Sequence, residues 1–345
     1  MRLDGTGPVL TAAGFVVATA VLLAFAWDAG HGRRRIILRA GVATACAVSV
    51  LATAGLQVNR LTDTYPTWKA LAGVADSGGS ESHRWHRVEP GTARGTIMTT
   101  TIAGRAGIAK PAYIYLPAAY SEPSERHTRF PVIEALHGYP GSPATWLRGL
   151  AARYYLDREI AAGRMAPTVV VFPYQTPRAL LDTECTNLAG GPQAETYLTR
   201  DVPAEIKARY RVRDDRAGWG LIGYSAGGFC ATNLGLRHPD EYAAAASLSG
   251  YAEAGIDIGD GSEHTTNNPA WRLRHLPRPA LGLYLAYAND DRHSRRDNLL
   301  LAGLAGGPLN VTTAVVAHGG HSDAVWQEME GPAFDWLSSW LARPA

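Results

Sequence analysis

A serine held in a glycine-framed turn is the clearest chemical signal in this sequence. Gly223-Tyr224-Ser225-Ala226-Gly227 follows the apolar run 219–222 and precedes a helix-compatible segment, 229–237. That strand–turn–helix context keeps a serine hydroxyl exposed on a strained turn, where a histidine can take its proton. Glycine at 223 and 227 lets strand and helix pass close together beneath the serine. Because such a pentapeptide also arises by chance in Gly/Ser-rich turns, its meaning depends on partners elsewhere in the chain.

Candidates for the acid and the base that a serine nucleophile requires follow further along the chain. Asp290 and Asp291 end one apolar run, and His318 and His321 follow the next, the second histidine after two glycines. An aspartate so placed can hold the imidazole in the correct tautomer and stabilise its charged form. We predict Asp291 as the acid and His321 as the base, with Asp290 and His318 as alternatives. Both aspartates could instead cap the helix expected near Ser294, a role compatible with catalysis by one of them.

The spacing of His318 and His321 could also suggest a metal site. A protein zinc site takes three or four ligands from cysteine, histidine and carboxylates. No neighbouring Cys/His/Glu cluster in the sequence supplies the remaining ligands. We therefore expect no metal, and no organic cofactor is implied.

A turn rich in glycine and proline follows the apolar run 131–136. It reads Leu136-His137-Gly138-Tyr139-Pro140-Gly141. In strand–turn–helix hydrolases, the loop after this strand and the residue after the nucleophile each supply one backbone N–H to the oxyanion hole. The predicted donors are the amides of Tyr139 and Ala226. Alone, the segment would be an ordinary turn; the serine motif downstream favours the oxyanion-hole interpretation.

From residue 95 onward, short β-rich runs alternate with helical patterns. This alternation predicts an α/β fold, a mostly parallel sheet flanked by helices. The later runs are almost continuously apolar, as expected for parallel strands covered on both faces. The expected strands span 96–102, 112–116, 131–136, 168–172, 217–223, 243–248, 281–288 and 311–317, and the expected helices 145–162, 196–210, 229–237, 294–304 and 323–341.

The first sixty residues differ from the rest because they contain two long apolar runs. Residues 8–27 carry no charge, and a second run covers about 38–58. At about 1.5 Å per residue, the first run forms a helix as long as a bilayer core is thick. Arg39 borders the second run, where its side chain can reach the headgroups. We therefore predict that residues 1–60 form a membrane anchor with two transmembrane helices.

The positive-inside rule gives this anchor an orientation. His31 and Arg33 to Arg35 lie in the expected loop between the spans, which places the loop in the cytoplasm and everything after residue 60 outside. Residues 61–92, with Ser77-Gly78-Gly79-Ser80, are interpreted as a linker, and 93–345 as the catalytic domain. The alternatives are a cleaved signal peptide, which leaves the second run unexplained, and buried core helices of a soluble domain.

The charge pattern argues against several classes of partner. The formal net charge is +2 over 345 residues, with both signs mixed along most of the chain. The sequence contains neither a basic groove for nucleic acid nor an acidic tail. We expect no nucleic-acid partner.

Together, these motifs resemble the putative-esterase branch of the α/β-hydrolases, which includes esterase D, enterochelin esterases and the mycobacterial antigen 85 mycolyltransferases. The order Ser225, Asp291, His321 is that of the α/β-hydrolase triad. An amino-terminal double span is not part of the branch's common pattern, which counts against the cytosolic S-formylglutathione hydrolase activity of some relatives. The resemblance rests on Leu136–Gly138, Gly223–Gly228, Asn289–Asp291, the Gly-Gly-His-x-x-x-x-Trp tail at Gly319–Trp326, and Glu195–Pro203.

The resemblance implies a mechanism more than a substrate. It implies a serine esterase that acts on carboxylic esters through an acyl-enzyme on Ser225, with a lipid or glycolipid of the cell envelope as a candidate substrate. The alternative is an acyltransferase of the antigen 85 type, which moves an acyl chain to a sugar. A peptidase and a catalytically silent envelope-binding module are further alternatives. The expected location is the cell membrane, with the catalytic domain extracytoplasmic.

The cysteines lead to a prediction that depends on this location. Cys46 lies within the second apolar run and is most simply a small buried residue. Cys185 and Cys230 fall in the domain expected outside, where a disulfide can form. Cys185 belongs to the irregular stretch 181–192, on the sheet edge where this fold gathers its active-site loops. We predict a bridge that pins this loop beside the acyl pocket, with two unpaired core cysteines as the alternative.

Overall fold

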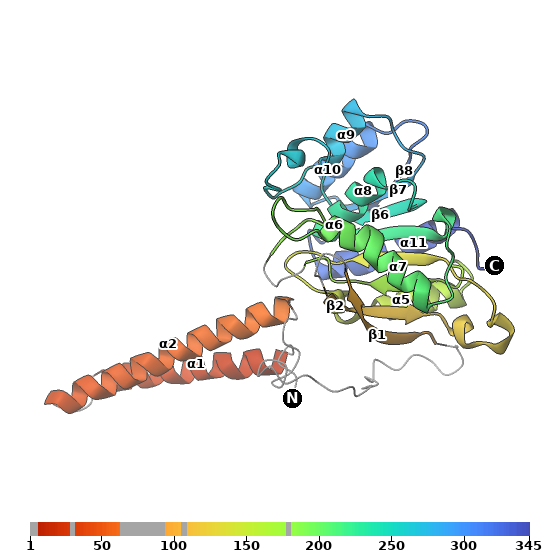
Figure 1. Ribbon diagram of the computed structural model, residues 1–345. Helices are drawn as coiled ribbons and strands as arrows, with labels where there is room; N and C mark the ends of the chain where they lie inside the picture. The colour runs from red at the N-terminus through yellow and green to blue at the C-terminus, as the bar shows by residue number, and fades with distance from the viewer. Residues whose placement is uncertain (1–5, 28–31, 63–93, 105–108, 177–180) are drawn as a thin grey trace. The chain divides into compact units, whose positions relative to one another are not determined.

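The computed structural model describes residues 6–27, 32–62, 94–104, 109–176 and 181–345 (Figure 1). The chain divides into two units, Met1–Arg87 and Val88–Ala345, each described here by itself. The first contains two helices and the second a single eight-stranded sheet with its helices.

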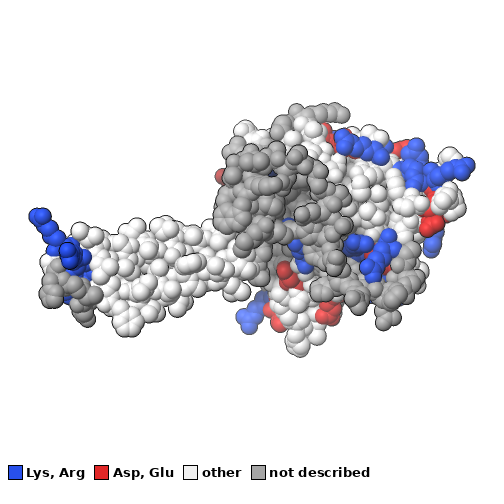
Figure 2. Space-filling model, turned by 90° about the horizontal axis from the view of Figure 1, so that it is seen from below, with Lys and Arg blue, Asp and Glu red and all other residues white. Residues whose placement is uncertain are grey.

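The amino-terminal unit consists of α1 (Thr6–Ala26) and α2 (Gly32–Thr62), which lie side by side (Figure 1). Gly7–Ala26 and Gly32–Asn59 are long and apolar enough to cross a membrane. On the face seen in Figure 2, basic side chains of this pair gather at one end. There the side chains of Arg35 and Arg39 donate hydrogen bonds to the carbonyl oxygen of Trp27.

The prediction for the amino-terminal unit was wrong about the position of the arginine cluster. Arg33 to Arg35 do not lie in a loop, because α2 begins at Gly32 and includes them. Arginine is a good helix former, and from α2 the guanidinium groups of Arg35 and Arg39 donate to the carbonyl oxygen of Trp27, just after the end of α1. At its other end α2 continues to Thr62, past the predicted end at 58 and into the predicted linker. The remainder of that linker lies outside the described residues.

The second unit is built on one mostly parallel sheet. Its spatial order is β1-β2-β4-β3-β5-β6-β7-β8. β1 and β2 are antiparallel to their neighbours, whereas all pairs from β4 to β8 are parallel. All eight expected strands are present, as β1 (Thr96–Ala103), β2 (Ala109–Leu116), β3 (Val132–Leu136), β4 (Val169–Phe172), β5 (Trp219–Tyr224), β6 (Ala244–Leu248), β7 (Gly282–Ala288) and β8 (Asn310–Val316).

Helices cover both faces of this sheet (Figure 1). Buried strand side chains alternate between two apolar clusters, one packed against α7, α8, α9 and α10 and the other against α4, α5 and α11. The central strands β3, β4, β5 and β6 are buried along their whole length, which explains their uninterrupted apolar sequence. The helices are α4 (Pro143–Arg148), α5 (Ala152–Ala161), α6 (Ala194–Thr196), α7 (Val202–Arg209), α8 (Ala226–Arg237), α9 (Pro269–His275), α10 (Arg292–Gly303) and α11 (Asp323–Trp340).

Two expected helices are interrupted. The segment 145–162 is two helices, because the chain turns between Gly149 and Ala151, where Ala151 has a left-handed φ of 57°. The segment 196–210 contains a wider π-helical turn, Tyr197–Asp201, directly before Pro203. Proline has no N–H and its ring clashes with the carbonyl four residues earlier, so a regular helix cannot run through it. The short helix α9, capped by Asn268, was not predicted because two turns give little periodicity.

Candidate active site

Ser225 occupies the sharp turn between β5 and α8. Its φ of 54° and ψ of −122° are unusual for a residue with a side chain, and its N–H donates to the carbonyl of Leu248 at 2.9 Å. The flanking glycines are required by contact. A Cβ at Gly223 would lie 1.9 Å from the carbonyl oxygen of Gly227, and one at Gly227 would lie 2.2 Å from that of Leu136. The close approach expected at these two positions is present.

A hydrogen-bonded series joins Ser225, His321 and Asp291. The Nε2 atom of His321 is 2.8 Å from the Oγ of Ser225, and its Nδ1 is 2.7 Å from the Oδ2 of Asp291. The structure therefore brings together the three side chains that the sequence nominated, from loops after β5, β7 and β8. Asp291 also caps α10, because its Oδ1 accepts a hydrogen bond from the backbone N–H of Ser294 at 3.3 Å. The capping and the acid interpretations are thus compatible in one carboxylate.

Asp290, the alternative acid, has a different set of contacts. Its carboxylate accepts hydrogen bonds from the backbone N–H groups of Gly319 at 3.1 Å and Gly320 at 2.9 Å. These two bonds hold the pKa of Asp290 below its usual range. Both glycines have positive φ, 125° and 63°, so the loop that carries His321 needs them. Asp290 fixes that loop, and the alternative base His318 is an exposed residue of the same loop.

The turn after β3 runs directly beside Ser225. A Cβ at Gly138 would lie 2.7 Å from the ring of Tyr224 and 3.3 Å from the Cβ of Ser225. Tyr139 follows in this turn, and Ala226 is the first residue of α8, where N–H groups have no acceptor within the helix. Ala226 thus follows Ser225 in sequence, and the turn that carries Tyr139 passes Ser225 at Gly138, so the two amides remain the predicted oxyanion donors.

The buried side chain of His137 stabilises this turn. It is fully buried, and burial lowers its pKa to about 4, so the imidazole is neutral at physiological pH. Its Nδ1 is 2.8 Å from the carbonyl oxygen of Gly138. Since a carbonyl can only accept, the proton of the neutral ring must be on Nδ1. This bond fixes the backbone orientation of the glycine next to the predicted oxyanion donor.

A disulfide joins Cys185 and Cys230. Cys230 lies in α8, and Cys185 lies in the loop that was expected to border the acyl pocket. The adjacent Glu184 accepts hydrogen bonds from the Tyr251 hydroxyl at 2.5 Å and the Gly255 N–H at 2.8 Å. Burial raises the pKa of Glu184 to about 7. The loop is therefore held both by a covalent bond to the nucleophile helix and by hydrogen bonds to the segment after β6.

Removing this disulfide should destabilise the protein. The two cysteines are 45 residues apart, for which the chain-entropy model gives roughly 4 kcal/mol of unfolding free energy. We expect Cys185→Ala/Cys230→Ala to lower the denaturant midpoint accordingly, whereas Cys46→Ala, in α2, leaves it unchanged. Peptide mapping without reductant should recover the two cysteines in one linked pair; free, alkylatable thiols in oxidised protein would contradict the assignment.

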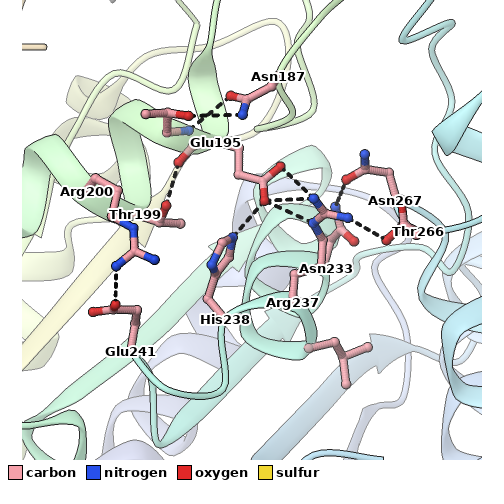
Figure 3. A network of polar contacts seen from close by, with 12 residues as sticks. Asn187, Glu195, Thr199, Arg200, Asn233, Arg237, His238, Glu241, Thr266 and Asn267 are labelled. Carbon is pink, nitrogen blue, oxygen red and sulfur yellow. Dashed lines mark hydrogen bonds and ion pairs between the residues drawn. The ribbon is translucent and has the colours of Figure 1, made fainter. Parts of the chain in front are cut away.

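A partly buried ion-pair network holds the far end of α8 (Figure 3). Glu195 of α6 accepts hydrogen bonds from Arg237 at 2.9 Å and lies 2.7 Å from the Nε2 of His238. Burial favours the protonated acid, but the bond from His238 and the charge of Arg237 outweigh it and keep the pKa of Glu195 low. Asn187 lies in the loop 181–192 that carries Cys185, called the cysteine loop below. Its Oδ1 accepts a hydrogen bond from the backbone N–H of Thr196 at 3.0 Å. The segment 195–203 noted in the sequence thus has a structural role, which sequence patterns alone did not reveal.

Trp326 is a site residue to which the sequence reasoning gave no role. Its ring lies perpendicular to that of His321, with centroids 5.0 Å apart, and 4.7 Å from the ring of Tyr224. The sequence signal that could have identified it is the spacing Gly-Gly-His-x-x-x-x-Trp. This spacing places Trp326 in the first turn of α11, next to the loop that carries His321. Within the described part of the chain, no group of three or more His, Cys, Asp or Glu side chains could hold a metal ion.

Comparison with known proteins identifies the family. The family described as putative esterase matches residues 107–343. The chain belongs to the putative esterase family. An uncharacterized protein of Corynebacterium glutamicum is 29% identical over 252 residues, which cover 67% of this chain and 57% of that protein. The chain therefore spans little more than half the length of this relative.

Solved structures place this putative-esterase chain in the α/β-hydrolase fold. A ferulic acid esterase superposes with a TM-score of 0.63 at 19% identity, covering 72% of this chain and 99% of that one. An S-formylglutathione hydrolase from Agrobacterium tumefaciens gives 0.61 at 15% identity, covering 73% and 98%. At such identities the likeness concerns the fold. The fold class and the family inferred from the sequence are both confirmed.

Proposed function

We propose that this chain is a serine esterase that hydrolyses carboxylic esters through an acyl-enzyme on Ser225. The observation that carries the proposal is the hydrogen-bonded series from Ser225 Oγ through His321 to Asp291, at 2.8 and 2.7 Å. This is the arrangement in which an imidazole can deprotonate a hydroxyl while a carboxylate holds its other nitrogen. Membership of the putative esterase family supports the same chemistry.

Each residue then has a defined step. The Oγ of Ser225 attacks the ester carbonyl as His321 takes the hydroxyl proton on Nε2, and the amides of Tyr139 and Ala226 stabilise the oxyanion of the tetrahedral intermediate. His321 returns the proton to the leaving alcohol, which leaves an acyl group on Ser225. Water deprotonated by His321 then attacks the acyl-enzyme and releases the acid. Asp291 accepts the hydrogen bond from Nδ1 and stabilises the imidazolium in both halves of the reaction.

The exposure of the base favours hydrolysis over transfer to a sugar. The side chain of His321 is 42% exposed, whereas that of Asp291 is 8% exposed. Transfer to a sugar hydroxyl requires that water be kept from the acyl-enzyme while the acceptor is held in place. An imidazole this open to solvent gives water direct access to the acyl group.

Product analysis tests the esterase proposal against acyl transfer. Purified protein should convert a short p-nitrophenyl ester to equal amounts of p-nitrophenol and free acid, with or without a sugar such as trehalose. Mass spectrometry of the quenched reaction should show the acyl group on the peptide that contains Ser225. Release of p-nitrophenol with the acyl group recovered on the sugar would instead establish the transferase.

We further propose that α1 and α2 anchor the enzyme in a membrane with the catalytic unit outside the cytoplasm. The length and composition of both helices support this, as do the arginines gathered at one end of the pair. The disulfide of the catalytic unit is what an oxidising compartment allows. Protease added to intact spheroplasts of an expressing host should therefore digest the chain after residue 62. Protection until the membrane is lysed would show the opposite orientation.

A further inference from the structure

A carboxyl group without partners is buried beneath the site. Glu330 of α11 is fully buried, and neither of its oxygens has a hydrogen-bond partner among the residues that the structure describes. The positive charge of Arg158 acts on this carboxyl. The Arg158 side chain also donates a hydrogen bond to Glu159. Burial outweighs this charge and raises the pKa of Glu330 well above its usual range, which favours the protonated form of the carboxyl. A buried polar group of this kind requires partners.

Two indole groups in the same cluster also lack partners. Within the described residues, the Nε1 atoms of Trp146 and Trp326 are buried without an acceptor. Trp326 and Glu330 are four residues apart on α11 and share a face of the helix. Trp146 packs on Phe334, four residues beyond Glu330, with ring centroids 6.4 Å apart. Tyr224 links the two indoles, at 5.2 Å from Trp146 and 4.7 Å from Trp326. Two indole N–H donors and one carboxyl, all buried and without partners among the described residues, thus belong to the same layer between the sheet and α11.

We propose that Glu330 is a positioning residue that acts on His321 through Trp326. Its carboxyl and the N–H groups of the two indoles are joined through internal water, which satisfies donors and acceptors together. This fixes the ring of Trp326, and the ring of Trp326 forms the buried wall against which the imidazole of His321 rests at 5.0 Å. The inference rests on the proposed esterase function.

Small displacements of the imidazole should be costly. His321 must keep both its 2.8 Å contact with Ser225 and its 2.7 Å contact with Asp291, although much of its side chain faces solvent. A misplacement of about 1 Å in a catalytic group can cost on the order of 100-fold in rate. A loosened Trp326 should therefore lower kcat and leave substrate binding unchanged.

The test compares two substitutions of Glu330. Glu330→Leu removes the polar contacts, and we expect kcat to fall about tenfold with KM within twofold of wild type, because reduced turnover without reduced binding reflects misplaced chemistry. Because this substitution also takes a partner from the buried indole N–H groups, its melting temperature is measured in parallel and kcat is compared at equal folded concentration. Glu330→Gln keeps one donor and one acceptor in a neutral group and should retain at least half of the wild-type kcat.

A matched control is Glu134→Leu. Glu134 is a second fully buried carboxyl with an unpaired oxygen and a raised pKa, about 8, but it bonds Tyr242 and lies on the other face of the sheet. Its kcat should stay within twofold of wild type. Equal kcat losses at positions 134 and 330, wild-type kcat in folded Glu330→Leu, or the same loss in Glu330→Gln as in the leucine variant would each overturn the proposal.

If Glu330→Leu does not fold, Trp326→Phe tests the proposal instead. It keeps an aromatic ring beside His321 and removes the indole N–H together with the rest of the five-membered ring, so a loss of about tenfold in kcat is expected. Wild-type kcat in this variant would overturn the proposal. Failure of the esterase function itself is distinguished beforehand, because wild-type protein would then show no ester turnover that depends on Ser225.

Discussion

Ser225→Ala should abolish ester hydrolysis and leave the protein folded. The Ser225 hydroxyl is the proposed nucleophile. Removing a member of such a triad lowers kcat by a factor on the order of 10⁴ to 10⁶. Alanine also has a Cβ and meets the same backbone geometry at φ 54°, so no new strain arises. The measurement is the hydrolysis rate of a short p-nitrophenyl ester, with melting temperature and circular dichroism to verify the fold.

The chain offers a matched control for this substitution. Ser249 follows β6, the neighbouring strand, and likewise has a positive φ, 53°, but its Oγ faces the sulfur of Met329 at 3.9 Å. Ser249→Ala should retain activity near that of wild type and still react with a fluorophosphonate probe. Substantial turnover by folded Ser225→Ala protein would refute the mechanism. A loss at Ser249 as large as that at Ser225 would show that the effect is not specific to the proposed nucleophile.

Asp291→Asn should lower kcat by roughly 10³- to 10⁴-fold, because an amide facing Nδ1 favours the wrong imidazole tautomer and cannot stabilise its charged form. Asp290→Asn should cost only about tenfold by comparison, since its amide oxygen can still accept from one of the two glycine N–H groups. The pH dependence of kcat should change chiefly in the first variant. Both proteins should be compared at equal folded concentration.

The histidine pair provides the same comparison for the base. His321→Gln should reduce turnover by several orders of magnitude, whereas His318→Gln, at an exposed position of the same loop, should have little effect. If Asp290→Asn or His318→Gln is the more damaging member of its pair, the acid or the base has been assigned to the wrong neighbour.

The parts of the site that could be predicted from the sequence are those governed by chain order. Parallel strands end at the same edge of a sheet, so Ser225, Asp291 and His321, each directly after an apolar run, were expected to meet. The glycines around Ser225 followed from the need for close backbone approach. The helix break at Ala151 was missed because alanine normally favours a helix, and only tertiary contacts impose its left-handed backbone.

What could not be predicted depends on side chains that meet across elements. Glu195 and Arg237 are 42 residues apart, and no local pattern announces that they pair. Asp290 and Asp291 have the same chemistry and adjacent positions in the sequence. Only the three-dimensional structure shows that Asp290 accepts hydrogen bonds from the loop amides and that Asp291 contacts the imidazole of His321. The buried carboxyl of Glu330 also lies in a helix whose sequence pattern gives no sign that it is unpaired.

The covalent link between the cysteine loop and α8 has a consequence for when the enzyme becomes competent. A chain still in a reducing cytosol has every catalytic side chain but lacks the bond between Cys185 and Cys230 that restrains one side of the site. With the catalytic unit outside the cytoplasm, as proposed above, we expect that restraint to be acquired only after export. The catalytic unit would then reach its full stability only at its destination.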